Sequence, residues 1–476
     1  MTVTEIDVCD SQMLYKGEWR IVMLEKMFHL KENRTTAKTE VLAGITTFMT
    51  MAYILAVNPS MLAAAGMDKT AVLMATCIAS FIGTLAMALL ANYPFALAPG
   101  MGLNAYFAYT VCGSMGYDWK IALMAVFVEG IIFIVLSLTN VREAIFNAIP
   151  TTLKKGVSVG IGFFIAFLGL QDGHIVVNND STLVTIVDFR GDFHTLGIGA
   201  ILAIIGLFLI AILYIRGVKG AILIGIVATW VLGMIAQAAG LYIPDAAAGF
   251  YSLYPVWGLT DFSSIGKTFG QCFQADFSVI RVFDFVVIIL SFLFVDMFDT
   301  LGTLIGVASK ADMLDKEGKL PNIKGALLSD AVGTTVGAMC GTSTVTTFVE
   351  SASGVAEGGR TGLTSLIAAI LFGLSLLLSP IFLAIPSFAT APALIIVGFL
   401  MLTSVTKIDF NDLTEAIPAF IAIIAMPFLY SISEGISMGV ISYVIINVVT
   451  GKAKEKKISV LMYVLAVLFI LKYIFI

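Results

Sequence analysis

The chain has 476 residues, of which 59% are hydrophobic and 12% are charged. Soluble domains are usually about 45–50% apolar and about 25% charged. Together with a mean hydropathy of +0.99, this composition excludes a soluble globular protein and indicates a polytopic membrane protein. The formal net charge of −5 says little about partners, because the few charged residues lie mostly in the connections between apolar runs.

The cysteine and histidine positions argue against several kinds of site. The five cysteines are scattered without a CxxC spacing, which disfavours a disulfide framework or a zinc site. All three histidines fall in connections, which disfavours a histidine proton relay within the membrane. Residues 1–40 are polar and contain no apolar stretch that ends in a cleavage site, so insertion is expected to begin with the first membrane helix. The sequence predicts no cofactor, no metal and no nucleic-acid partner.

A membrane-spanning helix needs about 20 predominantly apolar residues. Apolar runs of this kind follow one another along the chain, and two further apolar segments are interrupted, which together predict about fourteen crossings. The last run, 457–476, either spans the membrane or lies along its surface. The uninterrupted runs lie near 41–62, 70–91, 119–139, 157–171, 194–215, 219–241, 281–308, 323–340, 361–385, 388–405, 412–430 and 434–450, and the interrupted segments near 94–111 and 343–357.

The distribution of basic residues tests this count through the positive-inside rule. If the N-terminus is cytoplasmic, alternate connections are rich in lysine and arginine, whereas the longest intervening connections, 172–193 and 242–280, carry mainly aspartate. This pattern holds only if both interrupted segments cross the membrane. Each half would then have seven crossings, an odd number, so two related halves would be inverted relative to each other.

The first interrupted segment, residues 91–104, breaks the helix deep inside apolar sequence. Pro99 and Gly100 predict a half-helix that starts here, with the proline in its first turn, and Gly102 interrupts the backbone again. Asn104 is expected to project from this half-helix one turn further on. Non-helical backbone at membrane depth survives only when it is buried in protein or lines a cavity.

The second interrupted segment, residues 341–354, contains a Thr/Val run typical of a β-strand. The run is expected to end at Glu350 and to give way to a short helix near Ser351. Paired broken segments in corresponding places of two halves indicate the binding site of a transporter. The two half-helices, each with an extended strand behind it, would form a polar pocket at mid-depth. The alternative is that the proline and glycine kinks only ease helix packing.

Carboxylates within apolar helices are functional candidates, because each costs several kcal/mol at the bilayer centre unless it faces a partner or water. Asp296 and Asp299 lie in the middle of one apolar helix, on neighbouring faces and without a lysine or arginine nearby, and Thr303 follows them. Functional and structural roles both remain open for the others. These are Glu129, Asp284 at a membrane interface, Asp330 at a helix start, Glu350 and Glu357 beside Arg360.

The chemistry of these groups favours one kind of ligand. Carboxylates accept hydrogen bonds, helix N-termini donate them, and asparagine does both. A flat heterocycle with ring N–H donors and a carbonyl acceptor fits this set, whereas an inorganic anion would be repelled by the carboxylates. Phe348 offers a stacking surface, as do Phe95, Tyr106 and Phe107, although aromatic residues in membrane helices more often serve packing.

Several motifs at these positions resemble the nucleobase:cation symporter family, specifically its hypoxanthine/guanine/adenine permease branch. The resemblance runs from about residue 24 to the end of the chain. Its motifs are EVLAGITTFMTMAY (40–53), ALAPGMGLNAY (96–106), FDTLGTLIGVA (298–308), GTSTVTTFVESASG (341–354) and EGGRTG (357–362).

The resemblance implies the fold of uracil and purine permeases, an all-α membrane protein with fourteen segments in two inverted repeats of seven. Short antiparallel strands are expected in segments three and ten. After a cytoplasmic N-terminal segment, segments 1–4 and 8–11 would form a core domain, and segments 5–7 and 12–14 a gate domain. The corresponding ranges are 1–38 for the N-terminal segment, 39–140 and 281–386 for the core, and 141–241 and 387–476 for the gate.

In such permeases one acidic residue of segment eight and one of segment ten bind the base. These positions correspond here to Asp299 and Glu350, with Asp296 as an alternative to Asp299. Uracil-type members carry a histidine close to the segment-eight acid, where this chain has Thr303, so their proton-coupling step cannot be carried over. The expected substrate-binding residues are therefore Asp299, Glu350, Asn104, Gly102, Phe348 and Thr303, and the candidates for proton coupling are Asp296, Asp299 and Asp330.

The sequence thus predicts secondary uptake of purine nucleobases across the plasma membrane by proton symport, with hypoxanthine and guanine as substrates and adenine as a further candidate. The chain would be a transporter, not an enzyme, with its N-terminus in the cytoplasm, and a homodimer is expected by resemblance only. An anion transporter or channel of the same fold, and a xanthine- or uracil-specific permease, are the alternatives. A membrane enzyme would require a metal held by Asp299 and Glu350 or an activated nucleophile.

Overall fold

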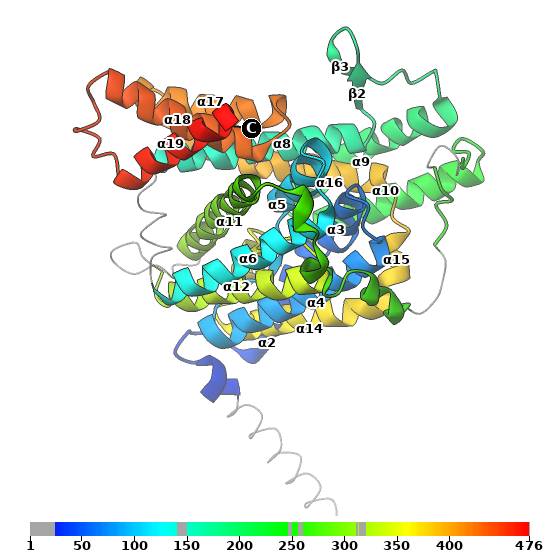
Figure 1. Ribbon diagram of the computed structural model, residues 1–476. Coiled ribbons are helices and arrows are strands. Elements are labelled where there is room, and N and C mark those ends of the chain that lie inside the picture. The colour runs from blue at the N-terminus through cyan, green and yellow to red at the C-terminus, as the bar shows by residue number, and fades with distance from the viewer. Residues whose placement is uncertain are drawn as a thin grey trace, which may run out of the picture.

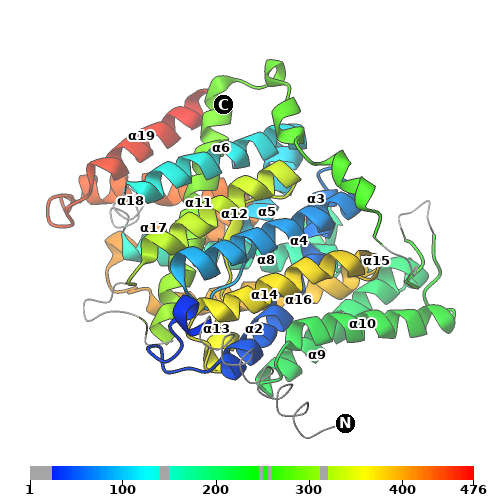
Figure 2. The ribbon, with the colours of Figure 1, turned by 90° about the horizontal axis from the view of Figure 1, so that it is seen from below.

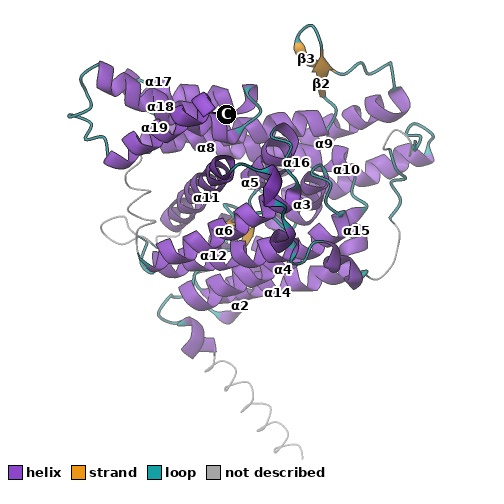
Figure 3. Ribbon diagram, in the orientation of Figure 1, coloured by secondary structure: helices purple, strands orange, loops and turns teal. Residues whose placement is uncertain are grey.

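The computed structural model describes residues 24–139, 150–245, 250–255, 260–310, 313 and 320–475. In this part of the chain helices form two packed groups, with a set of shorter or interrupted elements between them (Figure 1). Strand is confined to two short antiparallel pairs within the described residues (Figure 3). One pair lies in the interior of the protein and the other projects from it.

The first group of helices contains segments from both halves of the chain. In it α12 packs against α4 and α6, and α14 packs against α2 and α4, as seen from below in Figure 2. The group lies in the lower part of Figure 1. Its helices are α2 (Ala37–Met51), α4 (Lys69–Ala86), α6 (Trp119–Leu138), α12 (Ile323–Cys340) and α14 (Gly362–Ser375).

The second group likewise combines both halves, because α8 packs against α16 and α17, and α9 against α10 and α16. Small residues allow close approach there: a Cβ added to Gly162 would lie 2.7 Å from the Gly398 carbonyl oxygen. Glycines at such contacts are typical of helix packing in membranes. The helices are α8 (Thr151–Asp172), α9 (Ile198–Ile215), α10 (Ala221–Ala238), α16 (Ser387–Leu402), α17 (Leu413–Phe428), α18 (Ile432–Val449) and α19 (Val460–Phe475).

Three helices lie between the groups, and two of them contact helices of both groups. The long helix α11 (Val282–Lys310) contacts α6 of the first group and α8 of the second. The short helix α5 (Met101–Ala105) contacts α8 and α11, and α3 (Ile54–Ala63) contacts α4 and α16. These intermediate elements carry most of the polar residues that the sequence marked as candidates.

The interior strand pair joins the two halves of the chain at the interrupted segments. Strand β1 (Leu97–Pro99) pairs antiparallel with β4 (Val345–Thr347), so that Ala98 lies opposite Thr346. Both halves have the same order of helix, strand and short helix, since α4, β1 and α5 correspond to α12, β4 and α13 (Ser351–Ala356). The expectation of antiparallel strands in segments three and ten is confirmed.

The predicted spans are helical where the structure describes them. Among the described residues, seven helical segments are long and apolar enough to cross a membrane by length and composition, and four shorter helices are also apolar. The run expected to cover 361–385 is divided, since α14 ends at Ser375 and α15 (Ser379–Leu383) follows a short turn. The ambiguous run near 457–476 forms α19, which packs against α18.

The long acidic connections contain little regular structure. Residues in the first form the hairpin of β2 (Val176–Asn179) and β3 (Leu183–Ile186), which projects at the top of Figure 1. The second contains single helical turns at Phe262–Lys267, Gln271–Gln274 and Phe277–Val279. The turns at Phe262–Lys267 and Gln271–Gln274 pack against α4 and α6 of the first group.

The N-terminus of α14 is capped by a carboxylate from α2. Glu40 is fully buried, and its side chain accepts hydrogen bonds from the backbone N–H groups of Arg360, Thr361 and Thr364 at 2.8–3.3 Å. The first N–H groups of a helix have no intrahelical partner, and a negative charge is favourable beside them. Glu40 therefore fixes the start of α14 against the start of the first membrane helix.

A left-handed glycine allows α12 to end directly before β4. Gly341 has φ +105°, and a Cβ there would lie only 2.2 Å from Cβ of Thr268. The Thr268 hydroxyl donates to the Cys340 carbonyl at 2.8 Å, so that threonine closes the helix end and cannot withdraw without losing this bond. A side chain at position 341 is excluded both by the backbone conformation and by this contact.

We therefore expect Gly341→Ala to lower the thermal stability of the detergent-solubilised protein substantially. Gly240→Ala is the matched control, because Gly240 also follows a helix with positive φ (+72°) but nothing lies within 4 Å of its added Cβ. The Gly240→Ala control measures only the strain of placing an L-residue at positive φ, about 1–2 kcal/mol. Equal shifts in unfolding temperature for the two variants would contradict the steric role assigned to Thr268.

Candidate functional site

The strand pair brings the two short helices together at the centre of the protein. The Gly100 N–H donates to the Thr344 carbonyl, and the Phe348 N–H donates to the Ala96 carbonyl, both at 3.0 Å. Helix α5 begins after Gly100, and α13 begins after Glu350. The backbone groups released by the two helix breaks are therefore satisfied by each other, as non-helical backbone in a membrane requires.

The expectation that Pro99 lies in the first turn of the first half-helix is wrong. Pro99 is the last residue of β1 and lies opposite Val345, and Gly100 is the residue that caps α5. The physical reason is that proline lacks an N–H but keeps its carbonyl, so that it is tolerated at the end of a short strand. The extended segment consequently reaches one or two residues further along the chain than the sequence predicts.

Glu350 lies at the junction of β4 and α13, where the sequence places it, and it is bound by the first membrane segment. The Tyr53 hydroxyl donates to Glu350 Oε1 at 2.7 Å. Tyr53 is fully buried and lies in the break between α2 and α3. The sequence analysis did not single out Tyr53, although it is the last residue of the 40–53 motif.

The Asp299 carboxylate reaches the interior strand from α11. Thr346, in β4, donates from its hydroxyl to Asp299 Oδ2 at 3.3 Å. Both Glu350 and Asp330 lie within electrostatic range of Asp299. The carboxylates of Asp299 and Glu350 thus both accept hydrogen bonds from uncharged hydroxyl groups, those of Thr346 and Tyr53.

Asp296 points to a different partner from Asp299, although it lies on the same helix. Thr300 is within hydrogen-bonding distance of Asp296 Oδ1 at 2.8 Å and of Asp330 Oδ1 at 3.0 Å, and all three residues are fully buried. A threonine hydroxyl has one proton and can donate it to only one of two carboxylates at a time. A second full hydrogen bond in this trio requires a proton on one of the two acids.

Asn104 lies one turn into the first half-helix, as expected. Its Oδ1 accepts a hydrogen bond from the Ser343 hydroxyl. Its Nδ2 has no hydrogen-bond partner within the described residues, although the residue is fully buried. A buried amide donor without a partner costs about 1–3 kcal/mol, so this group is available for a ligand.

The remaining expected site residues, Gly102, Phe348 and Thr303, lie around the interior strand pair and differ in how deeply they are buried. Gly102 faces α8, because a Cβ there would lie 3.0 Å from Cγ2 of Ile161. Phe348 is buried beside the strand pair, and Thr303 is half-buried one turn past Asp299. Gly102 therefore marks the contact of the half-helix with the second helix group, while Phe348 belongs to the centre.

Glu129 is a further buried carboxylate near the strand. The Thr344 hydroxyl donates to Glu129 Oε2 at 2.6 Å, and the backbone carbonyl of the same threonine accepts from Gly100. The sequence left the role of Glu129 open. In the structure it holds the beginning of β4 against α6, which assigns it to positioning the strand. Within the described residues no group of three or more histidine, cysteine, aspartate or glutamate side chains could hold a metal ion.

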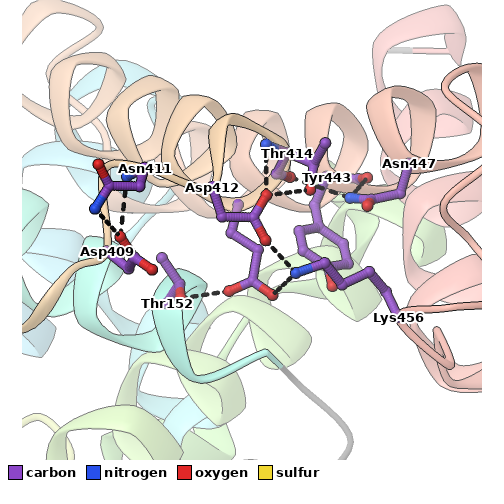
Figure 4. Close-up of polar contacts among 9 residues, drawn as sticks. Thr152, Asp409, Asn411, Asp412, Thr414, Tyr443, Asn447 and Lys456 are labelled. Carbon is purple, nitrogen blue, oxygen red and sulfur yellow. Dashed lines mark hydrogen bonds and ion pairs between the residues drawn. The ribbon is translucent and has the colours of Figure 1, made fainter.

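A second polar cluster lies at the ends of α17 and α18, beside an open surface depression lined by Asp409, Asn411 and Asp412. Figure 4 shows that the Lys456 side chain, from the connection between α18 and α19, extends into the polar cluster. Lys456 pairs with the carboxylates of Asp412 and Glu415. The cluster joins a loop to a helix start: Asp412 and Glu415 are paired with Lys456, and the exposed Asp409 is bonded by Asn411 (Figure 4).

The hydrogen bond from Lys456 and, to a smaller extent, the hydrogen bond from Thr414 lower the pKa of Asp412 to about 2. An aspartate with a depressed folded-state pKa stabilises the fold above its ordinary pKa of about 3.9. That contribution is lost only as the pH falls towards the folded-state value. The Asp412 carboxylate is therefore ionised throughout the physiological range, and we interpret its pairing with Lys456 as structural.

The fold and the central arrangement of carboxylates define a class of protein, the multi-pass membrane transporters with two broken segments. Comparison with solved structures agrees on the fold: the transmembrane domain of a cyanobacterial bicarbonate transporter, BicA, superposes with a TM-score of 0.58 at 14% sequence identity. The match covers 83% of this chain and 97% of that domain.

The sequence comparisons identify the family. A family model described as the Permease family matches residues 38–438. The guanine/hypoxanthine permease PbuO of Bacillus subtilis is 46% identical over 94% of this chain and 99% of its own length. The adenine permease AdeQ of Escherichia coli is 42% identical over 95% of this chain and 96% of its own length. The chain therefore belongs to the permease family, and the resemblance read from its motifs is confirmed.

We expect Lys456→Met to lower the unfolding temperature of the purified protein, because it leaves the carboxylates of Asp412 and Glu415 without their shared cation. Lys454→Met, in the same loop, is the control for a change in surface charge alone. The ion pairs of Lys456 are partly exposed, so the loss in the free energy of unfolding should be modest, on the order of 1 kcal/mol. A Lys456→Met protein as stable as the control would show that the ion pairs of Lys456 with Asp412 and Glu415 contribute nothing to the stability of the fold.

Proposed function

We propose that this protein takes up purine nucleobases, hypoxanthine and guanine first and adenine as a further candidate, by secondary active transport. Two relatives covering almost the whole chain are named as guanine/hypoxanthine and adenine permeases. The observation that carries the proposal is the placement of Asp299 and Glu350 near the interior strand, where their carboxylates are held by the hydroxyls of Thr346 and Tyr53. Both carboxylates can accept N–H groups of a planar base.

The other site residues complete the recognition of a base. The free Nδ2 of Asn104 would donate to a ring nitrogen or carbonyl of the base, which carries acceptors as well as donors. Phe348 would supply an apolar surface, and Thr303 a hydroxyl, whereas Gly102 would allow the half-helix to approach α8 closely. In this arrangement the ligand must present both donors and acceptors, which excludes a simple anion.

Proton coupling is assigned to the carboxylates of α11 and α12. Asp296, Thr300 and Asp330 are buried, and the Thr300 hydroxyl has one proton for two acids, so that a proton added to either acid would allow Thr300 to bond to both. Asp299 lies within electrostatic range of Asp330 and would sense a change in its charge. These contacts support Asp296, Asp299 or Asp330 as the carrier, with loading on one side of the membrane and release on the other.

The two helix groups would act as core and gate in an alternating-access cycle. The proposed core comprises 39–140 and 281–386, and the proposed gate comprises 141–241 and 387–476. Lys219, in the turn between α9 and α10, forms an ion pair with Glu357 at the end of α13, and this pair crosses from one group to the other. Such a partly exposed pair can break without a large cost.

The remaining assignments follow from the charge distribution and from the family. The protein spans the membrane several times, and we place it in the plasma membrane with its N-terminus in the cytoplasm, where the lysine- and arginine-rich connections also lie. A homodimer is proposed on family resemblance. A xanthine- or uracil-specific permease would use the same site, and a competition series of bases distinguishes these substrates.

An anion transporter of the same fold is the second candidate, because BicA is a bicarbonate transporter. Its sequence identity of 14% supports the fold alone. An anion site requires an electropositive pocket, whereas the groups found around Asp299 and Glu350 are hydroxyls and further carboxylates. The charge of the site therefore favours a neutral heterocycle over an anion.

We expect Asp299→Asn and Glu350→Gln each to reduce the uptake of labelled hypoxanthine in cells that lack other purine transporters. The loss in kcat/KM should be roughly tenfold or more, as for hydrogen bonds to charged groups. Asp284→Asn is the control, since Asp284 is also buried on α11 but binds Tyr117 and Arg281 instead. Undiminished uptake in both site variants, at normal amounts in the membrane, would refute the site assignment.

We also expect uptake to depend on a proton gradient. In proteoliposomes with an alkaline interior, one proton per base and a gradient of one pH unit should support about tenfold accumulation, because one unit is worth about 1.36 kcal/mol. A protonophore should abolish accumulation but leave equilibration of the base intact. Accumulation that survives the protonophore would contradict proton coupling while leaving the substrate assignment standing.

A further inference from the structure

We propose that Tyr53 is a positioning residue that sets the discrimination between bases by fixing the orientation of the Glu350 carboxylate. The inference rests on the proposed function, since it concerns how the same site selects its substrate. Tyr53 donates to one carboxylate oxygen, Oε1, at 2.7 Å. The other oxygen, Oε2, is then the one presented to the ligand.

The local backbone brings Tyr53 to this position. Helix α2 ends at Met51 and α3 begins at Ile54, and the intervening turn is closed by bonds from Leu55 N–H to the Ala52 carbonyl and from Ala56 N–H to the Tyr53 carbonyl. These tighter i to i+3 bonds interrupt the α-helical progression.

Close packing of α2 against α13 keeps the distance between the two side chains fixed. A Cβ on Gly354 would lie 2.0 Å from the Thr47 hydroxyl oxygen and 2.7 Å from the Ala43 carbonyl oxygen. The Thr50 hydroxyl also contacts the Glu350 carbonyl at 3.5 Å. The first segment and the segment-ten half-helix therefore behave as one rigid unit, and Glu350 cannot turn to follow different ligands unless the bond from Tyr53 breaks.

The consequence is chemical selectivity rather than affinity alone. A free carboxylate can rotate to accept N–H groups from several directions, whereas a carboxylate with one oxygen held by a phenol cannot rotate, so that its other oxygen faces the ligand from one fixed direction. A base that lacks an N–H in that direction would leave a buried acceptor unpaired, which is the costly case in recognition by hydrogen bonding. Removal of the Tyr53 hydroxyl should therefore relax the selection.

The test compares Tyr53→Phe with the wild-type protein in uptake of labelled hypoxanthine, in competition with 1-methylhypoxanthine and 9-methylhypoxanthine. We expect a roughly tenfold higher KM for hypoxanthine with kcat changed less than about threefold, as for loss of a binding contact. At least one of the two methylated bases should compete better relative to hypoxanthine than it does in the wild type. Tyr443→Phe is the matched control, because Tyr443 is as deeply buried but lies in the cluster of Figure 4.

The outcomes separate this inference from the function on which it rests. Wild-type protein that takes up no purine base overturns the proposed function and the inference together. Wild-type uptake combined with unchanged KM and unchanged competition ratios in Tyr53→Phe overturns the inference alone, as does an equal change in Tyr443→Phe. If Tyr53→Phe and Tyr53→Leu both fail to accumulate in the membrane while Tyr443→Phe accumulates, the residue is structural and the inference is also overturned.

Discussion

The pairing of β1 with β4 is the contact on which the rest of the structure depends. A membrane helix satisfies its own backbone, and any break at mid-depth exposes polar groups that the lipid cannot satisfy. Here two breaks, separated by more than two hundred residues of sequence, satisfy each other through the register that places Ala98 opposite Thr346. Neither break would be tolerated alone. The proposed binding site therefore lies where the two interrupted segments pair.

This constraint also explains why the acids of the site are surrounded by hydroxyl groups. The strand segment is rich in threonine because β-branched residues favour extended backbone, and its hydroxyls are then available to neighbouring helices. Thr344 binds Glu129, Thr346 binds Asp299, and Thr334 of α12 accepts from the Val345 N–H. Hydroxyls stabilise carboxylates without neutralising them. The site thus remains an acceptor of N–H groups, which a lysine or arginine in the same place would prevent.

The sequence predicts those parts of the fold that depend on local pattern. Apolar runs give the helices, and the Thr/Val run followed by Glu350 and Ser351 gives the boundary between β4 and α13 that the structure shows. Pro99 was placed in a helix because the local preference of proline for a first turn competes with strand pairing to Val345, which is visible only in three dimensions.

Contacts between distant segments could not be predicted in this way. The bond from Tyr53 to Glu350 spans 297 residues, and the capping of α14 by Glu40 spans about as many. Nothing in the spacing of a tyrosine or glutamate indicates such a partner. The difference between Asp296 and Asp299 is partly tertiary: Asp296 is bound by Thr300 of its own helix, which also contacts Asp330, whereas Asp299 is bound by Thr346 of β4.

The distribution of contacts between the two helix groups bears on how the protein could move. Within each group long helices pack along their lengths, whereas between the groups the contacts fall largely on short elements and on α11. The ion pair of Lys219 with Glu357 is about half exposed on the lysine side, at 53%, and less so on the glutamate side, at 29%. Ion pairs in such surroundings contribute at most about 1 kcal/mol. The structure consequently combines two tightly packed helix groups with a boundary that has fewer contacts between long helices. This boundary passes α5 at Gly102. The relative movement of the groups proposed above would therefore open the proposed site without disturbing the pair of β1 and β4.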